Sequence, residues 1–426
     1  MPEQLMQFDA TKPLPRAVTI LVLILALMGS WFVVRWYLGN TLAEFLDPDE
    51  HELSLGRTAV SLAPADPFTH WRLGTMVQRG LTPDQLPQVV SEYETAVALA
   101  PNDYRFWTVL GIALEQVGDS ERGEKALRRA TELAPSYAHP HWTLGNLLLR
   151  SGRYDEAFAE LQLASTADST YRRQLFNLAW EVYKQDIDSL KTAVGTTAQS
   201  RAEFSNYLVG RQRFEDGILL WQSLTPVEKR TNRAAGEGII STLVASHRYY
   251  QAAEVANDLV SGPVYRVTEG NFVNGGLEEN LTQQKGLVFG WQITSVPQAQ
   301  ILHDQSRSHS GGRSLRLVFQ VRTRLDSIKV SQTVLVKPDS EYDFEYYVKT
   351  EKLQSGGTPA IEIFDPVEGK VAAVSEAAPN GDTDWRRAAV SFKTGKKTEA
   401  VMVRFVRGSC GDDPVCPIFG KLWYDD

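Results

Sequence analysis

The chain has 426 residues, 43% of them hydrophobic and 23% charged, which is ordinary globular composition with room for two or three domains. Its formal net charge of −8 and the scatter of its basic residues argue against a nucleic-acid partner.

An uncharged apolar run from Ala17 to Val34 is the first feature of the chain. It is about the shortest run that spans the hydrocarbon core of a bilayer, and Arg35 can extend it by reaching toward the headgroups. A cleaved secretory signal needs small residues at positions −1 and −3 of the cut, but a cut after Ala26 places Ile24 at −3. We therefore expect a retained transmembrane signal-anchor helix over residues 17–38, with a cleaved signal or a buried globular helix as alternatives.

Basic residues beside this segment predict its orientation. Lys12 and Arg16 precede the span, whereas only Arg35 closely follows it. Positive charge favours the cytoplasmic side of a membrane. We expect residues 1–16 to form a cytoplasmic tail and the bulk of the chain to be extracytoplasmic, in the periplasm at a bacterial inner membrane.

A repeat follows, with steps of 37 and then 34 residues. Both a Leu-Gly pair and a proline recur at these steps, the pairs beginning at Leu73, Leu110 and Leu144 and the prolines being Pro64, Pro101 and Pro135. This period is typical of stacked helix pairs that bury their apolar faces against one another. Such arrays are surfaces that hold partners rather than sites of chemistry.

The best copy of the repeat runs from Trp107 to Pro135 and resembles the tetratricopeptide repeat family. Its Trp107, Leu110, Gly111 and Leu114 fall on one face of a predicted helix. The resemblance is clear over 67–169 and degenerate over 170–262, and the run from Asp186 to Thr197 breaks the period; the predicted α-solenoid occupies 45–262. Membership of this family implies a groove that binds a protein partner, with the repeated tryptophans and leucines forming the core between helices.

From about Glu269 the helical period gives way to alternation of apolar and polar residues. Seven candidate strands are separated by polar turns: Arg313–Val321, Ile328–Lys337, Glu341–Lys349, Ala360–Phe364, Arg386–Lys393, Val401–Arg407 and Lys421–Asp425. Short strands with this spacing predict an antiparallel β-sandwich. The fold class expected for the chain is therefore α+β multidomain: a transmembrane helix, an all-α solenoid and a β-sandwich over 269–426.

Three segments of the predicted sandwich resemble the jelly-roll carbohydrate-binding modules, which have the galactose-binding-like fold. They are Asn271–Glu279, His309–Leu315 and Leu422–Asp426. This resemblance implies binding of a glycan, although modules of this shape also bind protein.

The resemblance also implies two sites. A structural calcium ion would tie the first strand to the last, and Glu278 and Asp425 are the matching carboxylates. A sugar-binding face needs aromatic rings and planar polar groups, for which the candidates are Trp291, Tyr347, Trp385 and Arg404. For each candidate the alternative is a place in the core or on the plain surface.

The two cysteines, Cys410 and Cys416, are expected to form a small-loop disulfide in an oxidising compartment, with two free thiols as the alternative. The chain carries no hydrolase or metalloprotease motif, so it is not expected to be an enzyme. The leading interpretation is a membrane-anchored scaffold at the cell envelope, with a protein partner in the repeats and a glycan or protein on the sandwich, in assembly or export of a surface polysaccharide. A purely structural assembly protein and a polysaccharide-active enzyme are the other interpretations.

Overall fold

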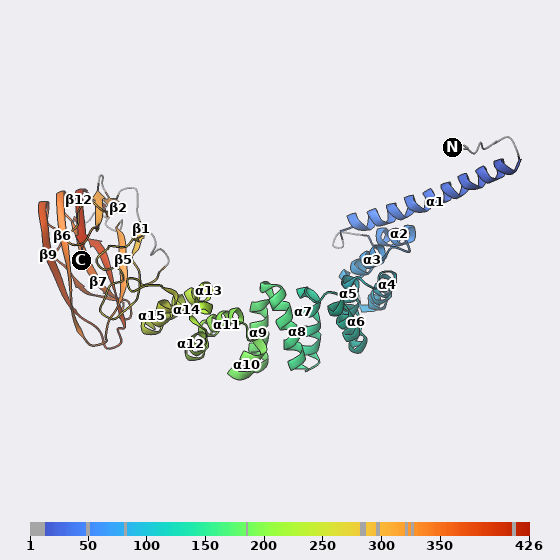
Figure 1. The fold of residues 1–426 in the computed structure, drawn as a ribbon, viewed down its shortest axis with the longest axis horizontal. Helices are drawn as coiled ribbons and strands as arrows, with labels where there is room; N and C mark the ends of the chain where they lie inside the picture. Colours follow the sequence, from blue (N-terminus) through green and yellow to red (C-terminus); the bar gives the residue numbers. More distant parts are fainter. Residues whose placement is uncertain are drawn as a thin grey trace, which may run out of the picture. The chain divides into compact units, whose positions relative to one another are not determined.

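A computed structural model describes residues 13–47, 52–80, 83–184, 186–281, 287–294, 299–319, 323–324, 328–410 and 415–426 (Figure 1). The chain forms two compact units, Met1–Gly195 and Thr196–Asp426, which are described in turn. Lys12, on which part of the orientation prediction depends, and most of the predicted cytoplasmic tail lie outside the described residues.

The first unit begins with a long apolar helix, α1 (Pro13–Phe45). Within the described residues, Arg16–Phe45 is the one stretch long and apolar enough to cross a membrane, with a mean hydropathy of 2.6. A signal sequence near the N-terminus has the same properties, so the helix is an anchor or a signal by composition. Figure 1 shows it as a single unbroken helix.

The end of α1 packs on the first helices of the array, α2 (Leu53–Leu62) and α3 (Pro67–Arg79). Gly39 makes this contact close: a Cβ there would lie 2.8 Å from the carbonyl oxygen of Ala59. Asn40 donates a side-chain hydrogen bond over 2.8 Å to Asp66, which also caps α3 by accepting from the amide of Phe68. The helix and the first repeat therefore form one packed structure.

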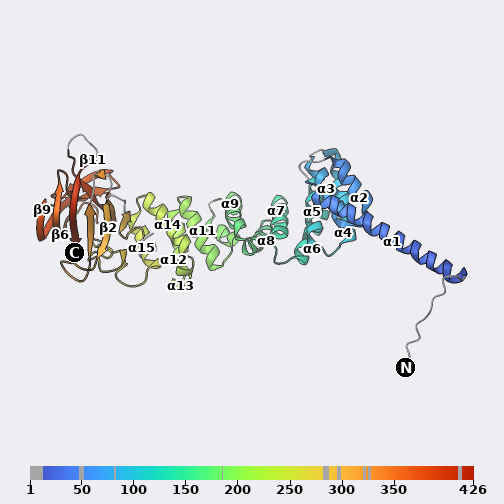
Figure 2. The ribbon, with the colours of Figure 1, turned by 90° about the horizontal axis from the view of Figure 1, so that it is seen from above.

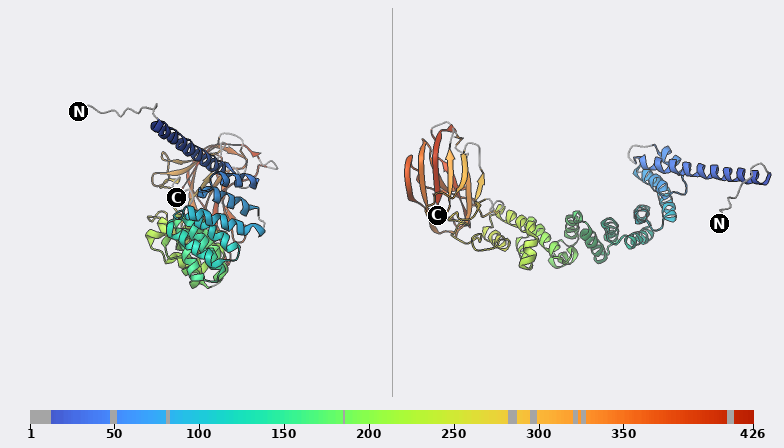
Figure 3. Two further views of the ribbon diagram at one scale, coloured as in Figure 1. Left: turned by 90° about the vertical axis from the view of Figure 1, so that its right-hand side faces the viewer. Right: turned by 45° about the horizontal axis from the view of Figure 1, so that its top comes forward.

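Helix pairs continue the first unit at the predicted period. After the 3₁₀ turn η1 (Pro83–Gln85) come α4 (Leu86–Leu99), α5 (Tyr104–Gln116), α6 (Ser120–Leu133), α7 (Ala138–Arg150), α8 (Tyr154–Ala167), the 3₁₀ turn η2 (Ser169–Tyr171), α9 (Arg172–Tyr183) and α10 (Ile187–Val194). We call α3, α5, α7 and α9 the first helices, and α4, α6 and α8 the second helices. Figure 3 shows the pairs following one another along the chain.

The glycine of each Leu-Gly pair lies where the two helices of a repeat touch. A Cβ on Gly111 would lie 2.5 Å from Cγ of Leu127, and one on Gly145 would lie 2.7 Å from Cγ of Leu161. Both leucines are fully buried. The repeat thus keeps glycine here because any side chain would push the second helix away from the first.

The segment that breaks the period is itself mostly helical. Asp186 caps α10 by accepting from the amides of Asp188 and Ser189, and Leu190 is fully buried. The eight residues of α10 are shorter than a second helix of the repeat, which is why the sequence loses its period there.

The second unit begins with five further helices: α11 (Ala198–Gly210), α12 (Phe214–Gln222), α13 (Pro226–Thr231), α14 (Arg233–Ala245) and α15 (Tyr249–Leu259). Figure 2 shows them next to the strands of the same unit. The pairs α11–α12 and α14–α15 lie within residues 170–262, where the sequence predicts degenerate repeats.

The strands form two antiparallel five-stranded sheets and a short two-stranded ladder. One sheet has the order β1-β5-β10-β7-β8, with β1 (Gln292–Thr294), β5 (Lys329–Leu335), β10 (Ala400–Arg407), β7 (Pro359–Asp365) and β8 (Lys370–Val374). The other has the order β2-β3-β12-β6-β9, with β2 (Ala299–Asp304), β3 (Ser314–Phe319), β12 (Ile418–Asp425), β6 (Glu341–Ser355) and β9 (Gly381–Lys393). The ladder pairs β11 (Val415–Cys416) with β4 (Thr323–Arg324). The predicted β-sandwich is confirmed.

Two apolar cores hold the second unit together. One lies between the sheets and includes Leu317, Ile363 and Leu422, each fully buried. The other joins the helices to the sandwich, because Trp221 and Leu259 belong to the same buried cluster as Leu335. The boundary expected at 262–269 therefore lies inside one compact unit, in which helices and sheets share buried residues.

Candidate functional site

Three rings meet on the outer face of the sheet that contains β6 and β9. Tyr347 of β6 points away from the core, since its neighbours Tyr346 and Val348 are buried between the sheets. The imidazole of His309 stacks on Tyr347 with ring centroids 3.5 Å apart, and it meets the indole of Trp385 edge-on at 5.9 Å. The structure thus brings together two of the residues predicted to bind sugar, and it adds a third ring.

His309 belongs to the loop between β2 and β3, which the C-terminal carboxylates hold in place. Asp425 accepts from the amides of His309 at 2.5 Å and of Ser310 at 3.2 Å. Asp426 accepts from Nδ1 of His309 at 2.5 Å and from the hydroxyl of Ser310. Burial raises the pKa of Asp425, and the two amides oppose that rise.

Glu278 holds the same loop from its other end. Its Oε1 accepts from the amide of Gly312 at 2.9 Å and from that of Arg313 at 3.3 Å. The backbone carbonyl of Glu278 also accepts from the Arg313 guanidinium at 2.8 Å. The two carboxylates predicted to bind calcium are therefore brought to one loop.

The partners of these carboxylates are N–H groups, and this chemistry does not fit a cation. Calcium takes six to eight oxygen ligands, whereas amides directed at a carboxylate occupy the lone pairs that a cation would use. Within the described residues there is also no group of three or more His, Cys, Asp or Glu side chains placed to hold a metal. The calcium site stays a prediction from resemblance, and the hydrogen bonds supply another way of holding the loop.

A set of ion pairs continues across the same outer face. Glu351 of β6 lies 2.8 Å from Nζ of Lys421 and also pairs with Arg307. These two cations, Lys421 first, lower the pKa of Glu351 to about 2. The Arg307 guanidinium in turn lies 4.8 Å from the ring of Trp423, which is fully buried although its strand position faces outward. This half of the face is covered by its own side chains.

Trp291 does not lie on this face, so its predicted role in stacking on a sugar is wrong. It is 8% exposed and belongs to the core between the sheets. Its indole donates to the carbonyl oxygen of Asn274 at 3.1 Å, and its ring stacks on Phe272 at 5.8 Å. A ring covered in this way cannot meet a ligand.

Arg404 lies on the opposite sheet, on β10. Its guanidinium is bonded to Glu362 and lies 4.3 Å from the ring of Phe364. The residues paired with Arg404 are those of β7 and β5, in the sheet that does not contain Tyr347 or Trp385. The four predicted sugar-binding residues therefore lie in three places. Trp291 lies in the core, Arg404 lies on one sheet, and Tyr347 and Trp385 lie together on the outer face of the other sheet.

Of the rings of Tyr347 and Trp385, the half-buried ring of Trp385 is the one that a sugar could stack on. His309 covers one face of Tyr347, so that face is not open to a sugar. His309 itself keeps 32% of its side-chain area exposed. His309 was not predicted as a site residue because it lies in a loop, outside any alternating pattern. The one indication in the sequence was its position at the start of the His309–Leu315 motif, two residues before Gly311.

The predicted cysteine pair lies at the ladder edge of the sandwich. Cys410 and Cys416 are bonded in the structure, with Cα atoms 5.5 Å apart. Cys416 is fully buried, next to the hydroxyl of Ser355 at 3.4 Å. The four residues Gly411–Pro414 between them lie outside the described part of the chain.

A second candidate surface is the helical array of the first unit, where charge is distributed unevenly. The first helices carry six arginines and two glutamates: Arg72, Arg79, Arg105, Arg150, Arg172, Arg173, Glu115 and Glu181. The second helices carry mostly acids: Glu92, Glu94, Glu121, Glu124, Glu132, Asp155, Glu156 and Glu160, against Arg122, Lys125, Arg128 and Arg129. The two rows of helices therefore differ in the sign of their charge.

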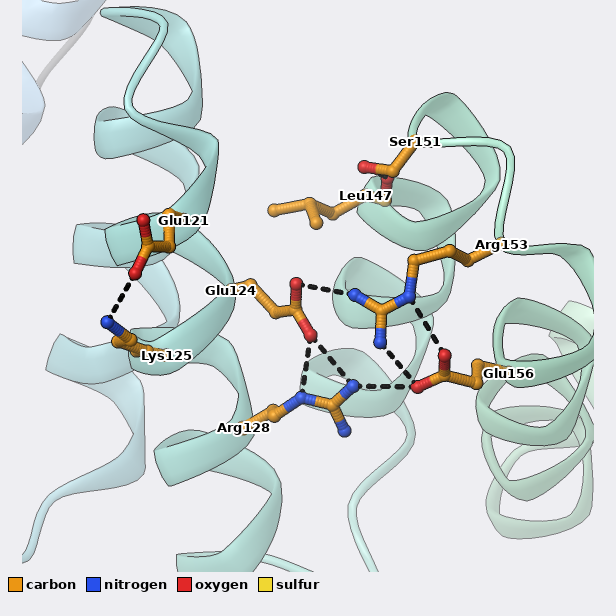
Figure 4. A network of polar contacts seen from close by, with 8 residues as sticks. All are labelled: Glu121, Glu124, Lys125, Arg128, Leu147, Ser151, Arg153 and Glu156. Carbon is orange, nitrogen blue, oxygen red and sulfur yellow. Dashed lines mark hydrogen bonds and ion pairs between the residues drawn. The ribbon is translucent and has the colours of Figure 1, made fainter.

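The basic residues of the second helices are paired with neighbouring acids. Figure 4 shows Arg128 of α6 between Glu124 and Glu156, and Arg153, at the N-terminus of α8, bonded to the same two carboxylates. Glu156 first, then Glu124, raise the pKa of Arg153. This network links two consecutive repeats through two arginines and two glutamates.

The first helices of consecutive repeats are linked by longer side chains. Gln78 of α3 donates to Gln116 of α5 at 2.7 Å, and Arg150 of α7 forms two bonds to Glu115 of α5, at 2.6 and 2.7 Å. Helices α5 and α7 also pack directly on each other. These helices thus present one continuous row to a partner.

Comparison with known proteins agrees with the array. The tetratricopeptide repeat family model matches residues 108–171. The peroxisomal targeting signal receptor of Saccharomyces cerevisiae is 29% identical over 99 residues, which are 23% of this chain. The match covers only 16% of that receptor's length.

Solved structures with similar parts include MamA residues 41–end from Desulfovibrio magneticus RS-1, with 18% identity, 39% of this chain and 90% of the other covered, and a TM-score of 0.31. YrrB, a TPR protein with an unusual peptide-binding site, has 12% identity, 49% and 92% coverage and a TM-score of 0.26. A CBM4 structure has 13% identity, 37% and 96% coverage and a TM-score of 0.28. With identities and TM-scores this low, no property is carried over from these three proteins. The family model and the observed helix pairs together identify the repeats of the first unit as tetratricopeptide repeats.

Proposed function

We propose that the protein is a membrane-anchored adaptor without catalytic activity, located at the cell envelope with the bulk of the chain outside the cytoplasm. Its tetratricopeptide repeats hold a protein partner, and its sandwich binds a glycan through the His309–Tyr347–Trp385 cluster. The role fits assembly or export of a surface polysaccharide.

The observation that carries the proposal is the presence in one chain of a repeat array and a sandwich with a partly exposed aromatic cluster. Repeat arrays of this family act as surfaces for protein binding. Sugars stack on aromatic rings, and the half-buried Trp385 offers such a ring next to the exposed polar edge of His309. The apolar helix α1 supports attachment to a membrane.

Glycan binding is tested with the full chain in detergent micelles, on an array of bacterial surface polysaccharides. Saturable binding that weakens about tenfold or more in Trp385→Ala supports the sandwich as the binding part, because a stacked ring contributes about 1.4 kcal/mol or more. Phe419→Ala is the matched control, since it removes another exposed aromatic ring from the same sheet. Equal binding by both variants, or none by the wild type, would contradict glycan binding at this cluster.

The adaptor role is tested by cross-linking in the source cells. Photo-reactive side chains at exposed positions of the first unit are expected to capture one defined envelope protein, in a pattern that depends on the position. Capture that is the same at every position, or none at any, would contradict the adaptor role.

A further inference from the structure

We infer that the last third of α1 lies along the membrane surface, with the side chains of Tyr37, Leu38 and Phe45 in the lipid–water interface, so that the first repeat is held directly on the bilayer. This inference rests on the membrane attachment in the proposed function. It adds a lipid-binding surface beyond the span and the height above the membrane at which the array begins.

The helix α1 is longer than the core of a bilayer. Its 33 residues form one unbroken helix of about 50 Å, whereas the hydrocarbon core is about 30 Å thick (Figure 1). The apolar stretch Arg16–Phe45 alone has 30 residues, or about 45 Å. A helix of this length crosses a bilayer either by tilting or by leaving part of its apolar surface outside the core.

The last third of α1 has two different faces. Gly39 and Ala43, four residues apart, are buried on the side that packs on α2 and α3. Tyr37, Leu38 and Phe45 are 61%, 52% and 81% exposed. Leu38 and Phe45 are seven residues apart and therefore lie on one face, two turns from each other. We call these three exposed residues the stripe; it is turned away from the array.

The continuity of the helix selects the bilayer as the partner of the stripe. Span and stripe belong to the same unbroken helix, so the lipid that covers the span also borders the stripe. Exposure of an aromatic ring as large as that of Phe45 to water is unfavourable, and the interface removes this cost. Trp36 and Tyr37 at the start of this segment are the residue types that gather at membrane–water boundaries.

The charged side chains near the stripe agree with this arrangement. The guanidinium of Arg35 donates to the carbonyl oxygen of Ser61 on α2, so its charge is directed at the array. Glu44 is exposed, but each residue turns an α-helix by about 100°, which places Glu44 at the side of Phe45 and not on the same line. An apolar stripe with polar residues at its margin is typical of a helix that lies in the interface plane.

The array begins close to the lipid in this arrangement. A Cβ on Gly39 would lie 2.8 Å from the Cβ of Ala63, so the chain that follows α2 touches α1 directly. An α-helix with its side chains is about 10–12 Å across. The first repeat is therefore held about one helix diameter above the stripe, with its exposed side turned away from the membrane.

Depth-dependent fluorescence quenching tests this inference with the full chain in phosphatidylcholine nanodiscs. One added cysteine carries the fluorophore NBD, and it is the single reactive thiol because the native cysteines are bonded to each other. Leu25→Cys reports on the middle of the span, and Thr41→Cys on the face of the stripe, between Leu38 and Phe45.

Thr58→Cys, on the exposed side of α2, is the matched control for Thr41→Cys. The two threonines lie at a similar height along α1, since a Cβ on Gly39 would lie 2.8 Å from the carbonyl oxygen of Ala59. An upright α1 places both labels at the same depth. We expect lipids spin-labelled at the headgroup to quench the Thr41 label roughly threefold more than the Thr58 label, because two helices lie between the two labels.

A substitution in the stripe tests the apolar contact itself. Phe45→Glu is expected to lower the quenching of the Thr41 label roughly twofold, because a charged side chain leaves the interface for water. Leu55→Glu makes the same kind of change on α2, at a residue that is 41% exposed, and is expected to have no effect. Both residues are exposed, so thermal unfolding in detergent should show both variants folded.

Equal quenching of the Thr41 and Thr58 labels, with the Leu25 label quenched by lipids spin-labelled deep in the acyl chain, would overturn the inference and leave membrane attachment standing. Equal effects of Phe45→Glu and Leu55→Glu would also overturn it. A Leu25 label that no lipid quenches is the separate result that contradicts membrane attachment, and the inference with it.

Discussion

The hydroxyl of Tyr250, on α15, lies 3.0 Å from the carbonyl oxygen of Val336 in the sandwich and 3.1 Å from Oε2 of Glu269. The amide of the same residue donates to Glu399 at 3.2 Å. One tyrosine thus connects α15 to three separate segments of the chain, at Glu269, Val336 and Glu399, next to the shared core that contains Leu335 and Ala400.

Replacing Tyr250 with Phe is expected to destabilise the second unit by about 1 kcal/mol, the usual net value of one hydrogen bond that is removed from a half-buried site. Chemical denaturation should show helical and sandwich signals changing together, in the mutant as in the wild type. Two separate transitions would contradict the shared core.

Removing the helices should also harm the sandwich. A fragment of residues 265–426 exposes Leu335 and Ala400, which are buried against the helices in the intact chain. We expect it to unfold at a lower temperature than residues 196–426, as measured by calorimetry. Equal melting temperatures would show that the helices contribute nothing to the sandwich.

Two histidines at equivalent repeat positions are expected to make the array less stable at high pH. Nδ1 of His70 lies 2.7 Å from Glu92 and its Nε2 lies 3.0 Å from the carbonyl oxygen of Pro64; His141 has the same arrangement with Glu160, at 2.6 Å. Both ring nitrogens face acceptors, so the doubly protonated imidazolium satisfies both contacts. The glutamate in each case raises the pKa of the histidine in the folded state above the usual 6.5.

The sign of the effect follows from linkage. Because the folded pKa is the higher one, the stabilisation is fully present below pH 6.5 and is lost as the pH rises through the folded pKa. We expect the free energy of unfolding of the array to fall between pH 6 and pH 9 by about 1 kcal/mol for each histidine. Denaturation curves of His70→Gln and His141→Gln should show this slope reduced; a wild-type stability that rises over this range would contradict it.

The close helix contacts predict a strong effect of one methyl group. Gly111→Ala places a Cβ 2.5 Å from Leu127 and 3.0 Å from the carbonyl oxygen of Gly123, so the helices must separate. We expect a loss of about 1–3 kcal/mol in the free energy of unfolding. Gly210→Ala, at the end of α11, is the control: its Cβ meets no atom within 4 Å, and the change should be neutral or stabilising.

The loop with His309 gives a test of the calcium prediction. Since amides of Gly312 and His309 already bond to Glu278 and Asp425, we expect the melting temperature of the second unit to be the same in calcium and in chelator. Glu278→Gln should lower it in both conditions, because charge-assisted hydrogen bonds contribute about 1.5–3 kcal/mol. A rise in melting temperature on adding calcium, absent in Glu278→Gln, would establish the metal site instead.

The sequence predicted the array well because helix pairs are local and periodic. Leu110, Gly111 and Leu127 mark one face of each helix at fixed spacing, so the period alone predicts both the pairs and their close contacts. The strands with strong alternation, such as β5 and β10, were likewise predicted within two or three residues. The edge strands β1, β2 and β8 were missed, and β1, with three residues, is too short to show a pattern.

The candidate site was harder to predict because it depends on contacts between distant segments. Tyr347 and Trp385 lie 38 residues apart on neighbouring strands, and only pairing of β6 with β9 brings them together. Trp291 and Trp385 are equivalent as residue types, and the sequence offers no measure of which one is buried. Arg404 lies between the core residues Val403 and Phe405, as expected for a side chain that points outward. It lies, however, on the sheet that does not contain Tyr347 and Trp385.

The packing of α1 on the first helices of the array has a geometric consequence. Gly39 and Asn40 fix the rotation of the helix about its own axis relative to α2 and α3, since the one allows close packing and the other is bonded to Asp66. Each residue of an α-helix turns by about 100°, so adding one alanine to the apolar stretch before Arg35 would swing the whole array through that angle relative to the start of α1. The number of residues in α1 thus determines the direction in which the array faces about the axis of that helix.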